Sequence, residues 1–154
     1  MKIPQGAWTL VKEVARHLLR RPVVGVAAAA QTHDGRWVLI RRTDTGLWAL
    51  PGGTLEWNET LREALIRELA EEAGVTMIGE GTLCGAYSDP SRDFRFHAVT
   101  LVVHARVSGP ERPPLNPLEI AEVRLFADHE LPEQLSHGMR DMLDNVRNKR
   151  SYWE

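Results

Sequence analysis

Apolar residues recur along this chain in two periods, one typical of helices and one typical of strands. A spacing of three and four residues predicts helices over Ala7–Arg20, Thr60–Ala73 and His137–Asn148. Denser apolar runs predict the strands Val23–Gln31, Arg36–Arg42, Leu47–Leu50, Leu83–Tyr87, His97–Val107 and Ile120–Phe126. Because strands lie before, between and after helices, the pattern predicts a mixed α/β (α+β) fold in one domain over residues 1–154.

Turn-forming residues mark the ends of these elements. Asp34-Gly35 is typical of a tight turn between the first two strands. Thr60 and Glu63 match a capping box at the start of the second helix, and Gly74 is placed to end it. The proline-rich stretch Ser108–Pro117 predicts a loop.

The first helix would be amphipathic. Its apolar residues lie on one side: Trp8, Val11, Ala15, Leu18 and Leu19. Lys12, Arg16 and Arg20 lie on the other side, and a solvated basic face is the simplest interpretation, with a partner surface as the alternative. We therefore predict an N-terminal helical extension over residues 1–21, ahead of a core domain over residues 22–148.

Composition narrows the class of protein. A length of 154 residues suits one core and is short for two ordinary domains. The net charge of −2 gives no electrostatic case for nucleic acid or a membrane surface as a partner. No apolar run reaches the roughly 18 residues of a membrane span, and the single cysteine, Cys84, excludes an internal disulfide. We expect a cytoplasmic protein.

The helix Thr60–Ala73 carries three carboxylates on the side that should be buried. At about 100° per residue, Glu68, Glu71 and Glu72 fall in one sector. Apolar residues of the earlier turns share nearly the same sector: Leu61, Ala64 and Leu65. Like charges at these spacings repel, and the cost rises as water is removed. A solvated glutamate-rich face is the simpler interpretation of the helix alone.

The surroundings of this helix favour a metal site instead. Gly52 and Gly53 can bring backbone carbonyls close to it, and Glu56 and Glu59 add carboxylates in the loop before it. Hard divalent cations prefer oxygen ligands, and no Cys/His set competes here. We predict bound Mg²⁺ or Mn²⁺, a phosphorylated substrate and attack by an activated water.

The same residues match the pattern G-x5-E-x7-R-E-U-x-E-E-x-G-U, in which U is a bulky apolar residue. Nine specified positions are filled within 23 residues: Gly53, Glu59, Arg67, Glu68, Leu69, Glu71, Glu72, Gly74 and Val75. This is the signature of the Nudix hydrolases, and the preceding LWALPGG resembles the usual lead-in. The chain therefore resembles that family from Val23 to about Asn148, which leaves the first twenty residues outside the resemblance.

The Nudix resemblance implies a fold and an activity. The fold would be an α/β/α sandwich with a mixed sheet between helices. The activity would be hydrolysis of a nucleoside diphosphate linked to another moiety, X. The resemblance further implies that Glu68, Glu71 and Glu72 ligate the metal, with the carbonyl of Gly52 as a fourth candidate.

Other site residues follow from the same resemblance. Arg67 is similar to the arginine that orients the glutamates, and Glu59 would lie in the outer part of that network. The general base varies among family members; Glu68 is our candidate and Glu119, just before the last strand, is its rival.

Two positions depart from the family pattern. Asn58 replaces a common glycine, but asparagine tolerates a left-handed backbone, so the turn can survive. Leu125 stands where many relatives have tryptophan, which argues against a stacking role there.

The segment Tyr87–Thr100 bears on the substrate. It resembles the S-x-P-x-R-D-P-R-x-H segment of Nudix ADP-ribose pyrophosphatases at Ser88, Pro90, Arg92, Asp93, Arg95 and His97. Phe94 and Phe96 replace the usual proline and glycine, and either ring could stack on a base. Arginine suits two-pronged phosphate binding, so the two arginines and the histidine are candidate substrate ligands. A solvated polar loop is the alternative interpretation.

These observations rank the substrates. ADP-ribose or another nucleoside diphosphate sugar comes first, and a nucleoside triphosphate cleaved in the MutT-like manner comes second. Dinucleoside polyphosphates and RNA 5′ ends follow. A non-catalytic nucleotide-binding regulator is the alternative from another class, and the intact glutamate set argues against it.

Two more residues are candidate substrate contacts, Trp48 beside the predicted site and Arg41 at the end of a strand. For Trp48 a core position is at least as reasonable. A homodimer is also expected because many Nudix relatives pair, with the helix Ala7–Arg20 as the candidate contact.

Overall fold

The computed structural model describes residues 11–15 and 20–154. Residues 11–15 are helical, whereas most of the remaining predicted N-terminal helix lies outside the described residues. The described strands are β1 (Val23–Thr32), β2 (Trp37–Arg42), β3 (Trp48–Ala49), β4 (Gly52–Thr54), β5 (Thr82–Tyr87), β6 (Ala98–Val107), β7 (Ile120–Phe126) and β8 (Tyr152–Trp153). The helices are α2 (Leu61–Glu68), which continues as a π-helical turn (Leu69–Ala73), and α3 (Met139–Arg147). Short 3-10 turns cover Asp128–Glu130 and Ser136–Gly138.

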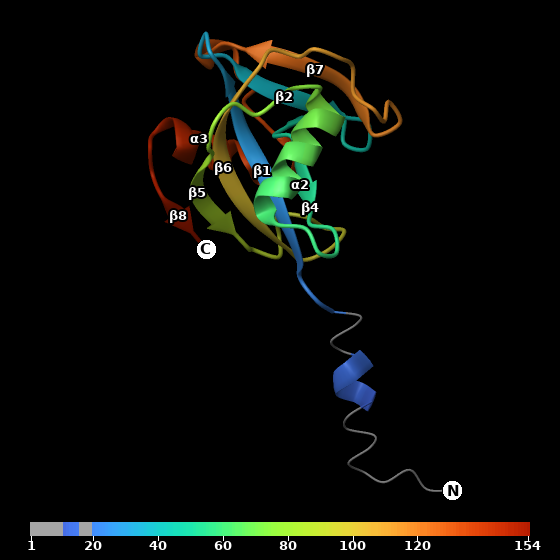
Figure 1. The fold of residues 1–154 in the computed structure, drawn as a ribbon. Coiled ribbons are helices and arrows are strands. Elements are labelled where there is room, and N and C mark those ends of the chain that lie inside the picture. Colours follow the sequence, from blue (N-terminus) through green and yellow to red (C-terminus); the bar gives the residue numbers. More distant parts are fainter. Residues whose placement is uncertain (1–10, 16–19) are drawn as a thin grey trace, which may run out of the picture.

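The strands form one mixed sheet. Its order is β3-β2-β1-β6-β5-β8, while β4 pairs with β1 and β7 pairs with β2. β1 and β6 run parallel along their whole length, from Val23 beside Ala98 to Thr32 beside Val107, and β5 and β8 are also parallel. Figure 1 shows α2 in front of β1 and β4, with α3 on the opposite side of the sheet.

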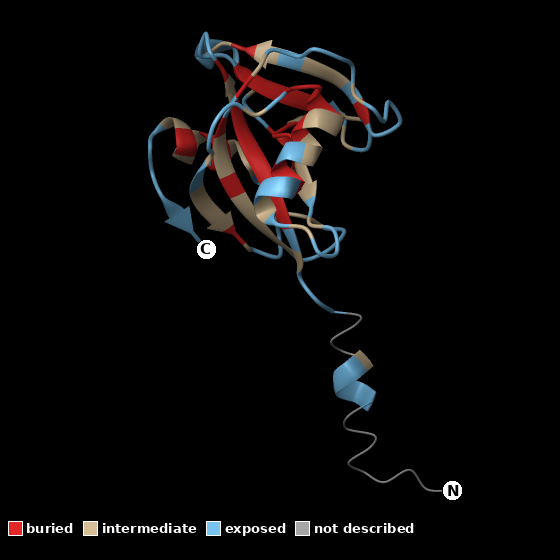
Figure 2. Cartoon of the chain, in the orientation of Figure 1, coloured by how far each residue is buried: buried red, intermediate tan, exposed pale blue. Residues whose placement is uncertain are grey.

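The central strand β1 explains why helices cover both faces. Val26, Ala28 and Ala30 pack in the core beneath α2, whereas Ala27 and Ala29 pack in the core beneath α3. The sequence of a strand that is buried on both faces is a continuous apolar run rather than an alternation of apolar and polar residues. Figure 2 shows this strand as a buried band through the middle of the domain. The predicted α/β/α sandwich is therefore confirmed.

The ends of α2 follow the predicted capping signals. The N–H of Glu63 donates to the Thr60 hydroxyl at 3.3 Å, and the N–H of Thr60 donates to the Glu63 carboxylate at 2.8 Å. Gly74 adopts a left-handed backbone with a φ of 63° and ends the helical segment. Asn58, in the loop before α2, also adopts a positive φ of 69°, as its tolerance for that region predicts.

The last part of this helical segment was predicted wrongly as ordinary α-helix. Residues Leu69–Ala73 form a wider π-helical turn, in which the N–H of Gly74 donates to the carbonyl of Leu69, and the N–H of Val75 reaches the same carbonyl at 3.2 Å. Such turns are frequent at functional sites. The three glutamates differ in exposure: Glu72 is buried, the side chain of Glu68 is 13 % exposed, and that of Glu71 is 45 % exposed.

Two short strands were not predicted from the pattern, β4 and β8. Each is too short to show a period: β4 is Gly-Gly-Thr, and β8 is Tyr-Trp. The strand expected from His97 begins one residue later, at Ala98. In the part of the chain that the structure describes, no helix is long and apolar enough to cross a membrane.

Candidate active site

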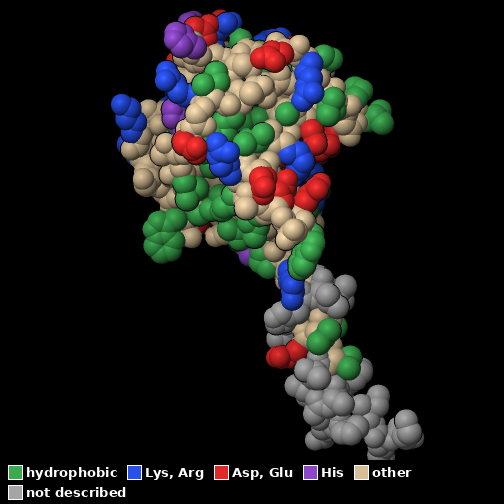
Figure 3. All heavy atoms as spheres, viewed as in Figure 1, with side chains coloured by type: hydrophobic (Ala, Val, Ile, Leu, Met, Phe, Trp, Pro, Cys, Tyr) green, Lys and Arg blue, Asp and Glu red, His purple; other side chains and the backbone are tan. Residues whose placement is uncertain are grey.

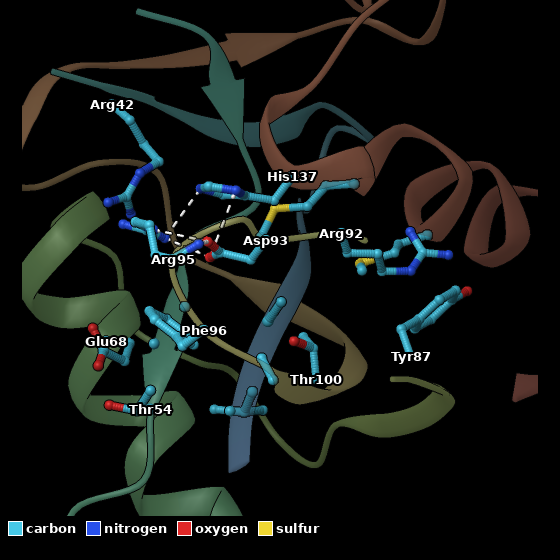
Figure 4. Close-up of a pocket in the computed structure, with 18 of the residues that line it drawn as sticks. Arg42, Thr54, Glu68, Tyr87, Arg92, Asp93, Arg95, Phe96, Thr100 and His137 are labelled. Carbon is cyan, nitrogen blue, oxygen red and sulfur yellow. Dashed lines mark hydrogen bonds and ion pairs between the residues drawn. The ribbon is translucent and has the colours of Figure 1, made fainter. Parts of the chain in front are cut away.

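A pocket of about 440 Å³ opens beside α2, above the start of β1 and β6. Glu68, Glu71 and Glu72 line one end of it, together with Gly52 and Gly53. The opposite side is formed by the segment Ser88–His97, here called the pocket loop, and by residues just before and within α3. Figure 4 shows Glu68 and Thr54 on one side of this space and Tyr87 and Arg92 on the other.

Two glycines let the carboxylates approach the sheet. A Cβ atom on Gly53 would lie 2.2 Å from Oε1 of Glu68, so only glycine leaves room for that carboxylate. A Cβ atom on Gly52 would lie 2.2 Å from the carbonyl oxygen of Val26. The N–H of Gly52 donates to Oε2 of Glu72 at 2.8 Å. The sheet and the helix thus meet at the carboxylates with no side chain between them.

Arg67 holds Glu68 from the other side. Its Nη1 donates to Glu68 at 2.8 Å, and its Nε and Nη2 donate to the two oxygens of Glu59 at 2.8 and 3.0 Å. Arg67 also lies 3.6 Å from Glu71. These bonds lower the pKa of Glu59 from 4.5 to about 2. The structure thereby brings together the predicted orienting arginine, its outer glutamate and the candidate base.

Inside the pocket, by contrast, burial raises the pKa of the glutamates. Burial, opposed in part by the bond from the Gly52 N–H, raises the pKa of Glu72 from 4.5 to about 8, with a further contribution from Glu68 and Glu119. Burial also raises the pKa of Glu68, against the pull of Arg67. Crowded, partly dehydrated carboxylates of this kind are stabilised in their charged form by a nearby cation.

The donor set suits a hard cation but does not form a closed cage. Within the described ranges, no group of three or more His, Cys, Asp and Glu side chains is arranged to hold a metal ion. Magnesium commonly takes one or two carboxylates and completes its shell with waters and substrate phosphates. The pocket offers oxygen donors of that kind at Glu68 and Glu72, so it fits Mg²⁺. The three-glutamate ligand set with the Gly52 carbonyl stays a prediction.

Three arginines line the pocket, and each is already paired with carboxylates. Arg42 donates to Asp44 at 2.9 and 3.0 Å and lies 3.9 Å from Glu119. Arg95 donates to Asp93 at 2.9 and 2.7 Å and to Asp44 at 3.1 Å. The third, Arg92, is bonded to acidic residues outside the pocket loop. An anionic substrate therefore meets no unpaired guanidinium among them.

Three predicted substrate contacts lie elsewhere. Trp48 packs edge-on against Phe126 with ring centroids 4.9 Å apart, and the guanidinium of Arg41 lies 5.8 Å from its ring centre. Arg41 pairs with Glu122 at 3.0 Å. His97 is exposed and bonds the carbonyl of Ser88 at 2.8 Å. None of the three lines this pocket, so their role as substrate contacts stays a prediction that the pocket geometry does not support.

The neighbour of one of these residues does line it. Successive side chains of a strand point to opposite faces, and Arg42 continues the side of β2 on which Val38 and Ile40 pack beneath α2. The alternation of β2 was a signal that could have selected Arg42 over Arg41.

No feature of the sequence predicted that another residue, His137, lines the pocket. It was expected to begin the last helix, but it adopts a left-handed backbone with a φ of 54°, ahead of α3. Its Nε2 lies 3.2 Å from Nη2 of Arg95, and its Nδ1 lies 3.6 Å from Asp93. Burial lowers the pKa of the His137 imidazole, opposed in part by the nearby Asp93 carboxylate. Met139 and Met142 of α3 add apolar surface beside it.

The family model described as "NUDIX domain" matches residues 19–146 of this chain. The chain belongs to the Nudix family. It is 40 % identical over 86 residues to a MutT-like protein of Streptomyces ambofaciens, covering 56 % of this chain and 53 % of that protein. It is 38 % identical over 97 residues to an ADP-ribose pyrophosphatase of Methanocaldococcus jannaschii, covering 61 % and 56 %. The chain thus spans about half the length of these curated Nudix relatives.

A solved structure covers more of the Nudix domain. The MutT Nudix hydrolase of Burkholderia pseudomallei superposes with a TM-score of 0.70 at 34 % identity, covering 82 % of this chain and 99 % of that one. The Nudix fold of the chain is therefore supported by both sequence and structure.

Proposed function

We propose that this protein is a Mg²⁺-dependent pyrophosphohydrolase that cleaves the diphosphate linkage of a nucleoside diphosphate derivative. The observation that carries the proposal is the charge of the pocket. Among the described lining residues, carboxylates outnumber arginines six to three, and the arginines are paired. A diphosphate can enter such a site only if bivalent cations neutralise the carboxylates. Within a Nudix fold, an oxygen-lined acidic pocket of this size suits a metal-bound nucleotide.

The residues around the carboxylates have different roles in hydrolysis. Arg67 fixes the Glu68 carboxylate from one side, and Gly53 leaves the space that it occupies. Glu68, with a pKa raised by burial, accepts the proton of the attacking water, and Glu119 is the rival for that role. The water oxygen bonds to a phosphorus of the diphosphate, and the bridging P–O bond breaks. When bound, Mg²⁺ stabilises the charge that develops on the phosphoryl oxygens.

ADP-ribose or another nucleoside diphosphate sugar is the leading substrate. The relative from M. jannaschii is named ADP-ribose pyrophosphatase, and its match covers 61 % of this chain. Apolar side chains among the described lining residues provide surface for a base or sugar: Tyr87, Phe96, Met139 and Met142. Phe94, the other candidate stacking residue, is 90 % exposed.

Hydrolysis of nucleoside triphosphates in the MutT-like manner is the second candidate. Its support is the similarity to the MutT-like protein of S. ambofaciens and to the solved MutT Nudix hydrolase of B. pseudomallei. Dinucleoside polyphosphates, RNA 5′ ends and a non-catalytic nucleotide-binding role rank below these two. A cytoplasmic location and a homodimer remain predictions.

A panel of nucleotides incubated with the protein and Mg²⁺ tests the proposal. With ADP-ribose we expect AMP and ribose phosphate; a triphosphatase of the MutT type would instead release a nucleoside monophosphate and pyrophosphate. Activity should disappear in chelator. Tight nucleotide binding with no turnover of any substrate would overturn the proposal in favour of the regulator.

A further inference from the structure

The C-terminal residues Tyr152–Glu154 lie against the base of the pocket loop. Tyr152 and Trp153 form β8, which pairs in parallel with Gly85 and Ala86 of β5. The N–H of Glu154 then donates to the carbonyl of Ala86 at 3.1 Å. β5 ends at Tyr87, one residue before the pocket loop begins. The backbone pairing thus places the side chain of Glu154 beside the first residues of that loop.

The Glu154 carboxylate is fully engaged by the pocket loop. One oxygen accepts the N–H groups of Ser88 and Asp89 at 2.6 and 2.5 Å. The other accepts from Nε of Arg92 at 2.9 Å and also from its Nη2. The side chain of Glu154 is 16 % exposed, and Arg92 holds its pKa below the ordinary value. The Glu154 carboxylate is therefore bonded to three residues of the loop, Ser88, Asp89 and Arg92.

Arg92 connects this carboxylate to α3. Its Nη1 and Nη2 donate to Asp141 at 3.1 and 2.7 Å, and Nη1 also donates to the carbonyl of Gly138 at 3.1 Å. Its guanidinium lies 4.9 Å from the ring centre of Tyr87. All three guanidinium nitrogens already donate to protein acceptors. Arg92 was predicted to bind substrate, but this geometry makes it a structural link.

The pocket loop depends on such contacts because it has little regular structure of its own. It contains turns and bends but no helix or strand. It nevertheless supplies side chains to the pocket wall: Asp89, Arg92, Asp93, Arg95 and Phe96. An irregular loop of this kind samples many conformations unless tertiary contacts hold it.

We propose that Glu154 is a substrate-positioning residue, which acts through Arg92 and the N–H groups of Ser88 and Asp89 to fix the pocket loop. It does not touch the reacting groups. The expected change in KM rests on the proposed function, whereas the expected ordering of the pocket loop does not depend on it. Loss of the carboxylate should cost binding of the nucleotide far more than it costs the chemical step.

The kinetic test compares Glu154→Ala with two controls, Trp153→Ala in the same strand and Glu133→Gln on the surface. Trp153 is 82 % exposed and Glu133 is exposed, so both controls should behave as wild type. For Glu154→Ala we expect KM for ADP-ribose, or for whichever nucleotide the protein turns over, to rise about tenfold, because binding must then order a pocket loop that has lost its carboxylate contacts. We expect kcat to stay within about twofold. An unchanged KM, or an equal rise in Trp153→Ala, would overturn the proposal.

A second measurement needs no activity. Amide hydrogen exchange in the substrate-free protein should become faster over residues 88–97 in Glu154→Ala and stay unchanged over α2. In an Arg92→Gln background, adding Glu154→Ala should accelerate exchange less than it does in wild type, because the two side chains act together. Unaltered exchange over residues 88–97 would refute the positioning role even if the enzyme is active. Absence of turnover in the wild type would refute the proposed function alone.

Discussion

At the scale of single residues, the site is governed by a conflict between burial and charge. Glu72 is 7 % exposed, and its pKa of about 8 reflects the cost of keeping a carboxylate charged there without a cation. Because this folded-state pKa exceeds the ordinary 4.5, the folded protein retains a proton that the unfolded chain releases. The stability of the metal-free protein should therefore fall as pH rises from about 4.5 to about 8.

Substitution of Glu72 by glutamine separates its stability role from its catalytic role. In chelator, Glu72→Gln should remove the part of the stability loss between pH 5 and pH 8 that comes from Glu72, as measured by Tm, while the part from Glu68 remains. With Mg²⁺, kcat should fall by at least about 100-fold, because even outer-shell partners of a metal contribute about 10–100-fold. Mg²⁺ should raise the Tm of the wild type and not that of the variant. Near-normal activity would show that Glu72 does not hold the metal.

Substitution of Arg95 tests which class of nucleotide the protein hydrolyses. Its Nε and Nη2 are held by Asp93, and its Nη1 has one N–H beyond the bond to Asp44. Arg95→Ala should raise KM for ADP-ribose by about tenfold, the loss expected for one charge-assisted bond, and should affect triphosphates less. Steady-state kinetics on both substrates, with Arg95→Lys as the charge-preserving control, measures this. Equal losses on both would count against the sugar nucleotide.

At the scale of elements, the contact between β4 and α2 sets how close backbone and carboxylates come. A Cβ on Gly53 would meet the flexible end of Glu68, whereas a Cβ on Gly52 would meet the backbone of Val26 and Ala27 at 2.2 and 2.7 Å. We expect Gly53→Ala to fold normally and lose activity by displacing the Glu68 carboxylate. Gly52→Ala should lower the free energy of unfolding by about 1–3 kcal/mol, the usual cost of overpacking.

Urea unfolding and kcat with Mg²⁺, measured on both variants, check this pair of expectations. Retained activity in Gly53→Ala would mean that Glu68 reaches its position without the space next to Gly53. Normal stability in Gly52→Ala would mean that β1 and β4 can separate at little cost.

At the scale of the whole molecule, Asp128 joins parts that are distant in the chain. Just after β7, it accepts from Nε of Arg147 in α3 at 2.8 Å and from Nε1 of Trp37 in β2 at 3.0 Å. Arg147 first, and then Trp37, lowers the pKa of Asp128 from 3.8 to about 2. Since the folded-state pKa is depressed, this stabilisation is complete above about pH 4 and disappears as pH falls toward 2.

Asp128→Asn should therefore destabilise the protein only at neutral pH. We expect a loss of about 0.2–1 kcal/mol at pH 7, the range for solvent-exposed ion pairs, and no difference from wild type near pH 2. Urea denaturation at the two pH values measures it, with Glu133→Gln as a control that should match wild type at both. A loss that persists in acid would assign the effect to the Trp37 bond rather than to charge.

Local signals in the sequence were enough for most of the elements, and they predicted a metal-binding role for the carboxylate face. Thr60 and Glu63 start α2, Gly74 ends the segment, and the apolar run of β1 indicates a strand buried on both faces. The spacing of Glu68 and Glu72 points to a cation site. These features depend on propensity, capping and periodicity over a few residues, so they can be read without knowing the rest of the fold.

Only the tertiary structure decided how the two arginines of the pocket loop are held. Arg92 and Arg95 look equivalent in the sequence and both line the pocket, yet Arg92 is bonded to Glu154, 62 residues away, while Arg95 is bonded to Asp44. His137 reaches the pocket because its backbone adopts a left-handed turn ahead of α3. Contacts between residues so far apart in the chain leave no periodic trace. Their geometry arises when the sheet brings the two segments side by side.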